Sequence, residues 1–135
     1  VNSIMGSISS QFGFELSIEI ILGYIFAPIA WLMGIPWSEA VISGELLGIK
    51  TTLNEFVAYP ALAALENGEL SDRSKLITFY SLCGFANLSS VGILISGITA
   101  MAPERKDDLI KVSFKALVGA TLASCMTGLI VGIFI

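Results

Sequence analysis

The chain has 135 residues, of which 55% are hydrophobic and 13% are charged, against about 25% charged residues in a typical soluble domain. Most of the charges lie in residues 66–75 and 104–115, which leaves long stretches without any charge. A soluble domain this small cannot hide so much apolar surface, so the composition indicates a membrane protein. The absence of histidine excludes histidine-based catalysis and metal binding, and the net charge of −4 disfavours nucleic acid as a partner.

The apolar segments follow a polar start. Residues 1–15 are rich in serine and glycine, and we expect a connecting segment there. Residues 20–38 and 116–135 carry no charge and are long enough to span a bilayer. Aromatic residues in the first of these stretches, such as Trp31 and Trp37, are typical of a membrane interface.

Residues 44–65 are apolar in character but contain Glu55 and Pro60. A single spanning helix would place an ionised Glu55 at its centre, which costs a few kcal/mol or more, and Pro60 disfavours a straight helix. The alternative is a re-entrant hairpin with two arms of about 11 residues, each reaching about 16 Å, roughly half the hydrocarbon thickness. We favour the hairpin, with Glu55 at or near its tip.

Residues 76–101 are uncharged, yet one continuous helix of this length would run about 39 Å, longer than the hydrocarbon core. The polar residues Asn87, Ser89 and Ser90 lie in the middle of the stretch, where they and Gly84 lower helix propensity. We therefore expect a helix broken near residues 84–90. Discontinuous helices of this kind surround the midplane sites of secondary transporters.

Structural explanations exist for the same polar residues. Asn87 and Ser89 could serve only as hydrogen-bonding groups between helices. Glu55 could be purely structural and paired with Lys50, although the cost of burying a carboxylate in a membrane favours a functional role.

Two longer motifs resemble a known family. Residues 48–59 (GIKTTLNEFVAY) resemble the G-x-K-x-x-x-N-E-F-x-A-Y signature of concentrative nucleoside transporters. Residues 71–74 (SDRS) and 82–90 (LCGFANLSS) resemble the R-S and C-G-F-A-N-x-S-S stretches of that family. Residues 102–105 and 116–123 resemble its A-P-x-R and K-A-L-x-x-G-T-L patterns, with Ala120 breaking an exact match, so the resemblance covers roughly residues 16–135.

The resemblance implies an all-α polytopic membrane protein with spanning helices, a re-entrant helical hairpin and a broken transmembrane helix, which together form one half of an inverted-repeat transporter. The implied segments are a scaffold transmembrane helix at 16–35, an interfacial segment at 36–43, the hairpin at 44–65, the broken helix at 71–101 and a C-terminal transmembrane helix at 104–135. The implied activity is cation-coupled nucleoside import by a homotrimer in the cell (inner) membrane.

The resemblance also implies a substrate site. Glu55, Asn87 and Ser90 match positions that bind the ribose of the nucleoside, and a carboxylate that accepts two O–H bonds suits a vicinal diol. Phe85 matches an aromatic residue beside the sugar, with ordinary packing as the alternative. No cofactor is expected. The coupling ion, sodium or a proton, is expected to bind outside this chain, in the upstream half of the same transporter, which is also the expected partner.

Three other functions fit the sequence less well. A channel or pore subunit predicts polar residues along a whole helix face, whereas here they are concentrated at one level. A non-transporting membrane assembly protein leaves Glu55 without a purpose. A membrane enzyme is disfavoured because the sequence offers no convincing pair of nucleophile and base.

Overall fold

The computed structural model describes residues 18–66 and 68–135, so the connecting segment expected at 1–15 lies outside the described residues. This part of the chain is helical and contains no strand, which confirms the expected all-α fold class. In chain order the helices are α2 (Ile18–Leu32), α3 (Trp37–Thr52), α4 (Glu55–Ala64), α5 (Asp72–Leu82), α6 (Leu88–Met101), the short 3₁₀ helix η1 (Pro103–Arg105) and α7 (Lys106–Phe134).

The first two helices are joined by a sharp bend. The segments Ile20–Leu32 and Trp37–Thr52 meet at 118°. Gly34 in the turn adopts φ +93°, a left-handed conformation that favours glycine, and Pro36 precedes the first residue of α3. Helix α3 then runs without interruption through the expected boundary between the interfacial segment 36–43 and the hairpin 44–65.

Both expected interruptions are present and both are followed by an asparagine cap. Helix α3 ends at Thr52, and the Asn54 side chain accepts a hydrogen bond from the Val57 amide at the start of α4. Helix α5 ends at Leu82 and α6 begins at Leu88, which confirms the break expected near 84–90. Asparagine is favoured at such positions because its side-chain oxygen satisfies an amide that has no partner inside the helix.

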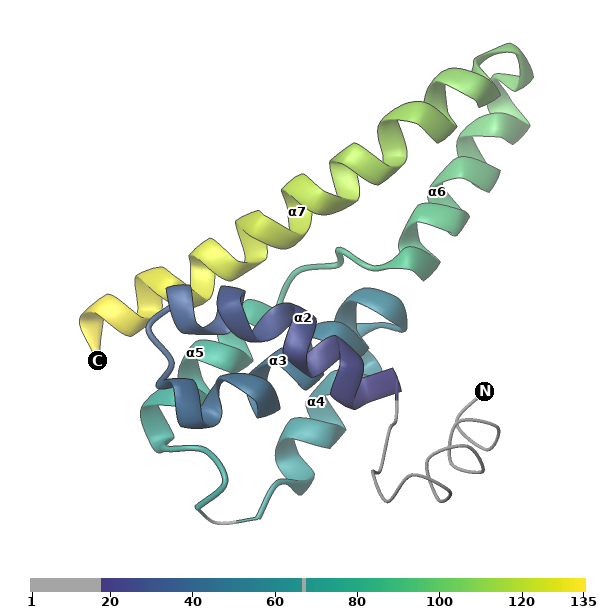
Figure 1. The fold of residues 1–135 in the computed structure, drawn as a ribbon. Coiled ribbons are helices and arrows are strands. Elements are labelled where there is room, and N and C mark those ends of the chain that lie inside the picture. The colour runs from purple at the N-terminus through teal and green to yellow at the C-terminus, as the bar shows by residue number, and fades with distance from the viewer. Residues whose placement is uncertain (1–17, 67) are drawn as a thin grey trace, which may run out of the picture.

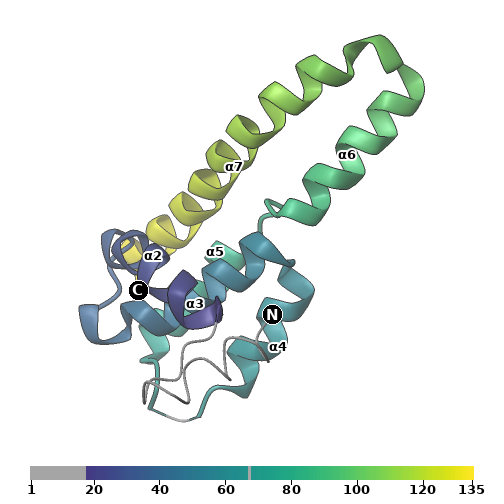
Figure 2. The same ribbon diagram turned by 45° about the vertical axis from the view of Figure 1, so that its right-hand side comes forward.

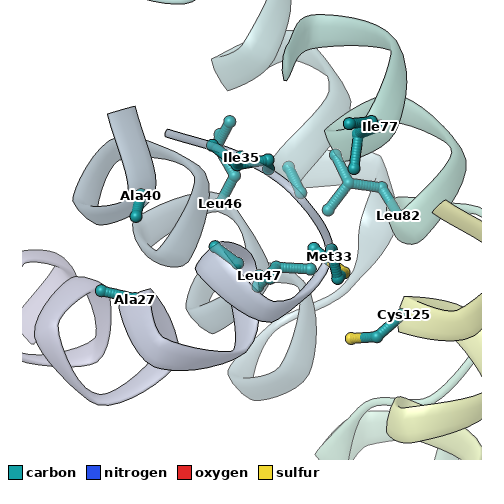
Figure 3. Close-up of a cluster of buried hydrophobic side chains, with 11 residues drawn as sticks. Ala27, Met33, Ile35, Ala40, Leu46, Leu47, Ile77, Leu82 and Cys125 are labelled. Carbon is teal, nitrogen blue, oxygen red and sulfur yellow. The ribbon is translucent and has the colours of Figure 1, made fainter. Parts of the chain in front are cut away.

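The helices form a packed body and a projecting arm. Figures 1 and 2 show α6 running beside α7, away from the group formed by α2 to α5. The buried apolar core lies where α2, α3, α5 and the C-terminal part of α7 meet, and includes Leu47, Ile77 and Cys125 (Figure 3). In contrast, α6 buries no residue within the described part of the chain.

Length and apolarity identify one helical stretch in the described residues that could cross a membrane by itself, Pro103–Phe134. The bent pair of α2 and α3 passes the same test when the two helices are taken together, and α6 is a shorter apolar helix. The helices too short to cross a membrane alone are those next to a bend or a break. This is expected for one half of a transporter built from discontinuous helices.

Arg73 of α5 forms hydrogen bonds to the turn after α2 and to the end of α7. From the first turn of α5, its Nη1 donates to the Gly34 carbonyl at 2.6 Å and its Nη2 donates to the Gly132 carbonyl at 2.7 Å. These carbonyls lie just after the end of α2 and near the end of α7, where backbone oxygens lack partners within the helix and carry partial negative charge. The Ser71 side chain caps α5 by accepting a hydrogen bond from the Ser74 amide.

Candidate functional site

Glu55 lies directly after the break between α3 and α4. It is the first residue of α4 and is only 6% exposed. A carboxylate in the first turn of a helix is stabilised by the partial positive charge of the unpaired amides there. The fold therefore accommodates a buried acidic side chain at this position.

Asn87 connects the break between α5 and α6 to the break between α3 and α4. Its Oδ1 accepts a hydrogen bond from the Ser90 amide at 2.7 Å and so caps α6, while its Nδ2 donates to Oε2 of Glu55 at 3.1 Å. Asn87 is 2% exposed, so this contact is buried. The carboxylate of Glu55 thus lies beside the starts of two helices, α4 and α6, and this side-chain pair joins two segments that are far apart in sequence.

Ser90 and Phe85 lie on the same groove as Asn87. The groove has a volume of about 240 Å³ and runs between the start of α6 and the facing side of α7. Its walls are mostly apolar and include Leu94 and Leu117. Phe85 is 72% exposed within the described chain, so its ring is open to a ligand or to further protein. A concave, largely apolar site with a few polar groups is typical of small-molecule binding.

The structure therefore brings the four residues singled out by the sequence to one region, in two different relations. Asn87, Ser90 and Phe85 line the groove, and Glu55 is connected to the groove through Asn87. Ser89 is exposed and does not line the groove, which separates it from its neighbour Ser90.

Lys50 is a member of this region that the sequence suggested only as a partner for Glu55. Its side chain is fully buried, and its Nζ makes no hydrogen bond within the described residues. The amine lies beside the α5–α6 break, since a Cβ placed on Gly84 would be 3.6 Å from Nζ. A direct hydrogen bond between Lys50 and Glu55 is therefore absent, although the two groups are close enough to interact electrostatically.

Tyr59 and Cys83 form a contact that sequence reasoning missed. The Tyr59 hydroxyl lies 3.0 Å from the Cys83 Sγ, and the Tyr59 ring packs on Phe79 with centroids 5.1 Å apart. This contact ties α4 to the end of α5 next to the break. The only available signal was that both residues lie inside the two motifs, since nothing in their spacing indicates that they meet.

The chemistry available here is recognition by hydrogen bonding. The region supplies a carboxylate acceptor, an amide and a hydroxyl in mostly apolar surroundings, a combination suited to a small ligand with both hydrogen-bonding groups and apolar surface. Among the described residues, no cluster of three or more histidine, cysteine, aspartate or glutamate side chains could hold a metal ion.

Comparison with known families gives a consistent result. A family model described as the C-terminus of Na⁺-dependent nucleoside transporters matches residues 1–132. The nucleoside permease NupC of Helicobacter pylori is 44% identical over 125 residues, which cover 90% of this chain and 30% of the permease. Solute carrier family 28 member 3 of mouse is 41% identical over 148 residues, which cover 98% of this chain and 21% of the carrier.

Solved structures agree with the sequence comparison. The structure of CNTnw in an inward-facing, substrate-bound state superposes with a TM-score of 0.89 at 42% identity, covering 98% of this chain and 33% of that one. The chain thus spans about a third or less of the length of these relatives.

Proposed function

This chain belongs to the concentrative nucleoside transporter family, whose C-terminal region it matches, and on that premise we propose that it forms the sugar-binding side of a nucleoside site in a cation-coupled symporter. The members of this family are integral proteins of the cell membrane, and they are transporters rather than enzymes. The activity belongs to the full-length transporter, in which this chain is the C-terminal transport portion.

The observation that carries the proposal is the hydrogen bond between Asn87 and Glu55. This hydrogen bond joins the α3–α4 break to the α5–α6 break. It also holds the Glu55 carboxylate next to Asn87, one of the residues that line the groove. A buried carboxylate in a membrane protein is costly and is generally retained for a function. Recognition of a ligand that donates hydrogen bonds is the function best matched by these surroundings.

Each residue has a proposed role. The Glu55 carboxylate accepts hydrogen bonds from the vicinal hydroxyls of ribose, since ionised acceptors form short and strong bonds with O–H donors. Asn87 holds this carboxylate and offers its own amide to the sugar, and Ser90 adds a hydroxyl from the first turn of α6. Phe85, an exposed residue of the groove lining, packs against the sugar and excludes water from the hydrogen bonds beside it.

The other binding sites of the transporter are proposed to lie outside this chain. The nucleobase and the coupling ion, sodium or a proton, would bind to the upstream half of the same transporter, and three copies of the full-length protein would assemble. The segments 16–35, 36–43, 44–65, 71–101 and 104–135 would act as scaffold helix, interfacial segment, hairpin, broken helix and final spanning helix.

Uptake of labelled nucleosides tests this function. The full-length transporter, reconstituted in proteoliposomes, is given uridine or adenosine under a sodium gradient, a proton gradient or no gradient. We expect gradient-dependent uptake of at least one nucleoside, and the effective gradient identifies the coupling ion. Folded protein that transports neither nucleoside under any gradient would contradict the proposal.

Two matched variants assign the role of Glu55 in the same assay. Glu55→Gln keeps the size of the side chain and removes its charge, so we expect uptake to fall to near background while the protein still inserts and assembles. Glu66→Gln makes the same chemical change in an exposed loop and should leave uptake unchanged. Normal uptake by Glu55→Gln would exclude Glu55 from substrate binding.

A further inference from the structure

Lys50 poses a physical problem that the proposed ribose site does not solve. Its side chain has 0% exposure, and its Nζ lacks a hydrogen-bond partner among the described residues. Burying an ammonium group away from water is costly unless another charge or dipole compensates for it. The groups around Nζ therefore indicate what the lysine does.

Three elements converge on this amine. Lys50 lies in the last turn of α3, and its Nζ lies against Gly84, directly after the end of α5. A Cβ on Gly84 would also collide with the Ser124 side chain of α7, so the lysine, the break and α7 are in close contact. The ends of α3 and α5 both carry partial negative charge, which favours a cation at this position.

The titratable groups that interact with Lys50 come from each neighbouring element. Glu55 belongs to α4, Cys83 follows the end of α5 and Cys125 belongs to the buried face of α7. Tyr59 of α4 completes the set, because it interacts with both Glu55 and Cys83. Glu55 is the one carboxylate in this set, so it is the natural counter-charge for the lysine.

We propose that Lys50 is a positioning residue for nucleoside binding, which holds the Glu55 carboxylate in its ribose-accepting place through charge rather than through a hydrogen bond. This inference rests on the proposed role of Glu55. Asn87 occupies Oε2 of Glu55 by hydrogen bonding, and Lys50 balances the charge from inside the protein. The carboxylate is thereby anchored without losing all of its acceptor capacity to the protein.

A double-mutant cycle in the full-length transporter tests this coupling. Lys50→Met keeps a similar length and removes the charge, Glu55→Gln neutralises the carboxylate, and the third variant combines the two. We expect each single change to weaken uridine binding by about tenfold or more, and the double variant to bind no more weakly than Glu55→Gln alone, because the lysine then has no carboxylate to position. Fully additive losses would overturn the proposal. Lys106→Met, an exposed change, is the control and should bind uridine normally.

A second readout separates positioning from general structural damage. We expect Lys50→Met to weaken uridine binding much more than binding of 2′,3′-dideoxyuridine, which lacks both ribose hydroxyls. Equal losses for both ligands would indicate that the lysine only supports the fold. Lys50→Arg, which keeps the charge, should retain more of the preference for uridine than Lys50→Met, and equal loss in the two variants would contradict a role for the charge.

The outcomes distinguish this inference from the proposed function. Unchanged uridine binding by Glu55→Gln would overturn the ribose site itself, whereas a defective Glu55→Gln with a normal Lys50→Met would overturn only the role of the lysine. If Lys50→Met folds but is too unstable for ligand-binding measurements, its thermal unfolding decides. We then expect the double variant to be more stable than Lys50→Met, since it leaves no uncompensated carboxylate, and no gain in stability would contradict the pairing.

Discussion

Asn87 donates a hydrogen bond of 3.1 Å from its Nδ2 to Oε2 of Glu55, across 32 residues of sequence. The same side chain caps α6 through its Oδ1, which accepts from the Ser90 amide. One amide therefore fixes the start of a helix and the position of a buried carboxylate at the same time. The two breaks become a single recognition surface through this residue.

Replacing Asn87 by aspartate separates its two tasks. Asn87→Asp keeps an oxygen that can cap α6, but it loses the amide donor and places a second carboxylate beside Glu55. Because like charges at this distance repel, we expect the KM for nucleoside uptake to rise by about tenfold or more with little loss of helical content. Asn87→Ser, which keeps a capping oxygen without adding charge, should be less affected. A wild-type KM for Asn87→Asp would contradict the assigned contact.

The adjacent serines provide a matched pair. Ser90 lines the groove, whereas Ser89 is exposed and lies outside its lining. We expect Ser90→Ala to raise the KM for a ribonucleoside several-fold, as is typical for the loss of one hydrogen bond, and Ser89→Ala to leave it near the wild-type value. Uptake kinetics of both variants check this, and the opposite order would mean that α6 presents a different face to the ligand.

Gly84 tests how tightly the break packs against α7. A methyl group at this position would collide with the Ser124 hydroxyl, so Gly84→Ala forces the break and α7 apart. We expect a destabilisation of about 1–3 kcal/mol, seen as a lower Tm of the full-length protein. Adding Ser124→Ala removes the nearest obstructing atom and should recover part of the loss. A Tm unaffected by Gly84→Ala would show that the break has more room than the packing indicates.

Arg73 tests the stability of the body independently of the groove. Arg73→Met removes two charge-assisted hydrogen bonds to backbone carbonyls, and we expect it to lower the stability by about 2 kcal/mol. Arg105, with an exposed ion pair to Asp108 at 3.2 Å, is the matched control, and Arg105→Met should change the stability by less than about 1 kcal/mol. Equal shifts in Tm for the two variants would be evidence against a stabilising role for the two Arg73 hydrogen bonds.

The two breaks could be predicted from the sequence because neither segment fits a single straight spanning helix. Glu55 lies inside an apolar stretch, and Asn87 lies at the centre of a segment too long for one span. The two breaks depend on local composition, which a single sequence reveals. In contrast, the bend at Gly34 and Pro36 interrupts the stretch 20–38, whose composition alone predicts a span, and only the family resemblance implied a boundary here, between segments 16–35 and 36–43.

The contacts between breaks could not be predicted in the same way. Nothing in the spacing of Lys50 indicates that its amine lies beside Gly84, because this depends on how α3 packs against α5 and α7. The double use of the Asn87 amide likewise requires the positions of α4 and α6 relative to each other. Periodicity assigns a residue to a helix face, but it does not identify what that face meets.

Recognition of the ribose hydroxyls by Glu55 can be tested by ligand discrimination. Binding of uridine and of 2′,3′-dideoxyuridine to the full-length transporter is measured by calorimetry for the wild type and for Glu55→Gln. We expect the wild type to prefer uridine by a factor of about ten to a hundred, the range expected for hydrogen bonds to a charged group, and this preference to disappear largely in Glu55→Gln. A variant that binds uridine more weakly but keeps the full preference would contradict the claim.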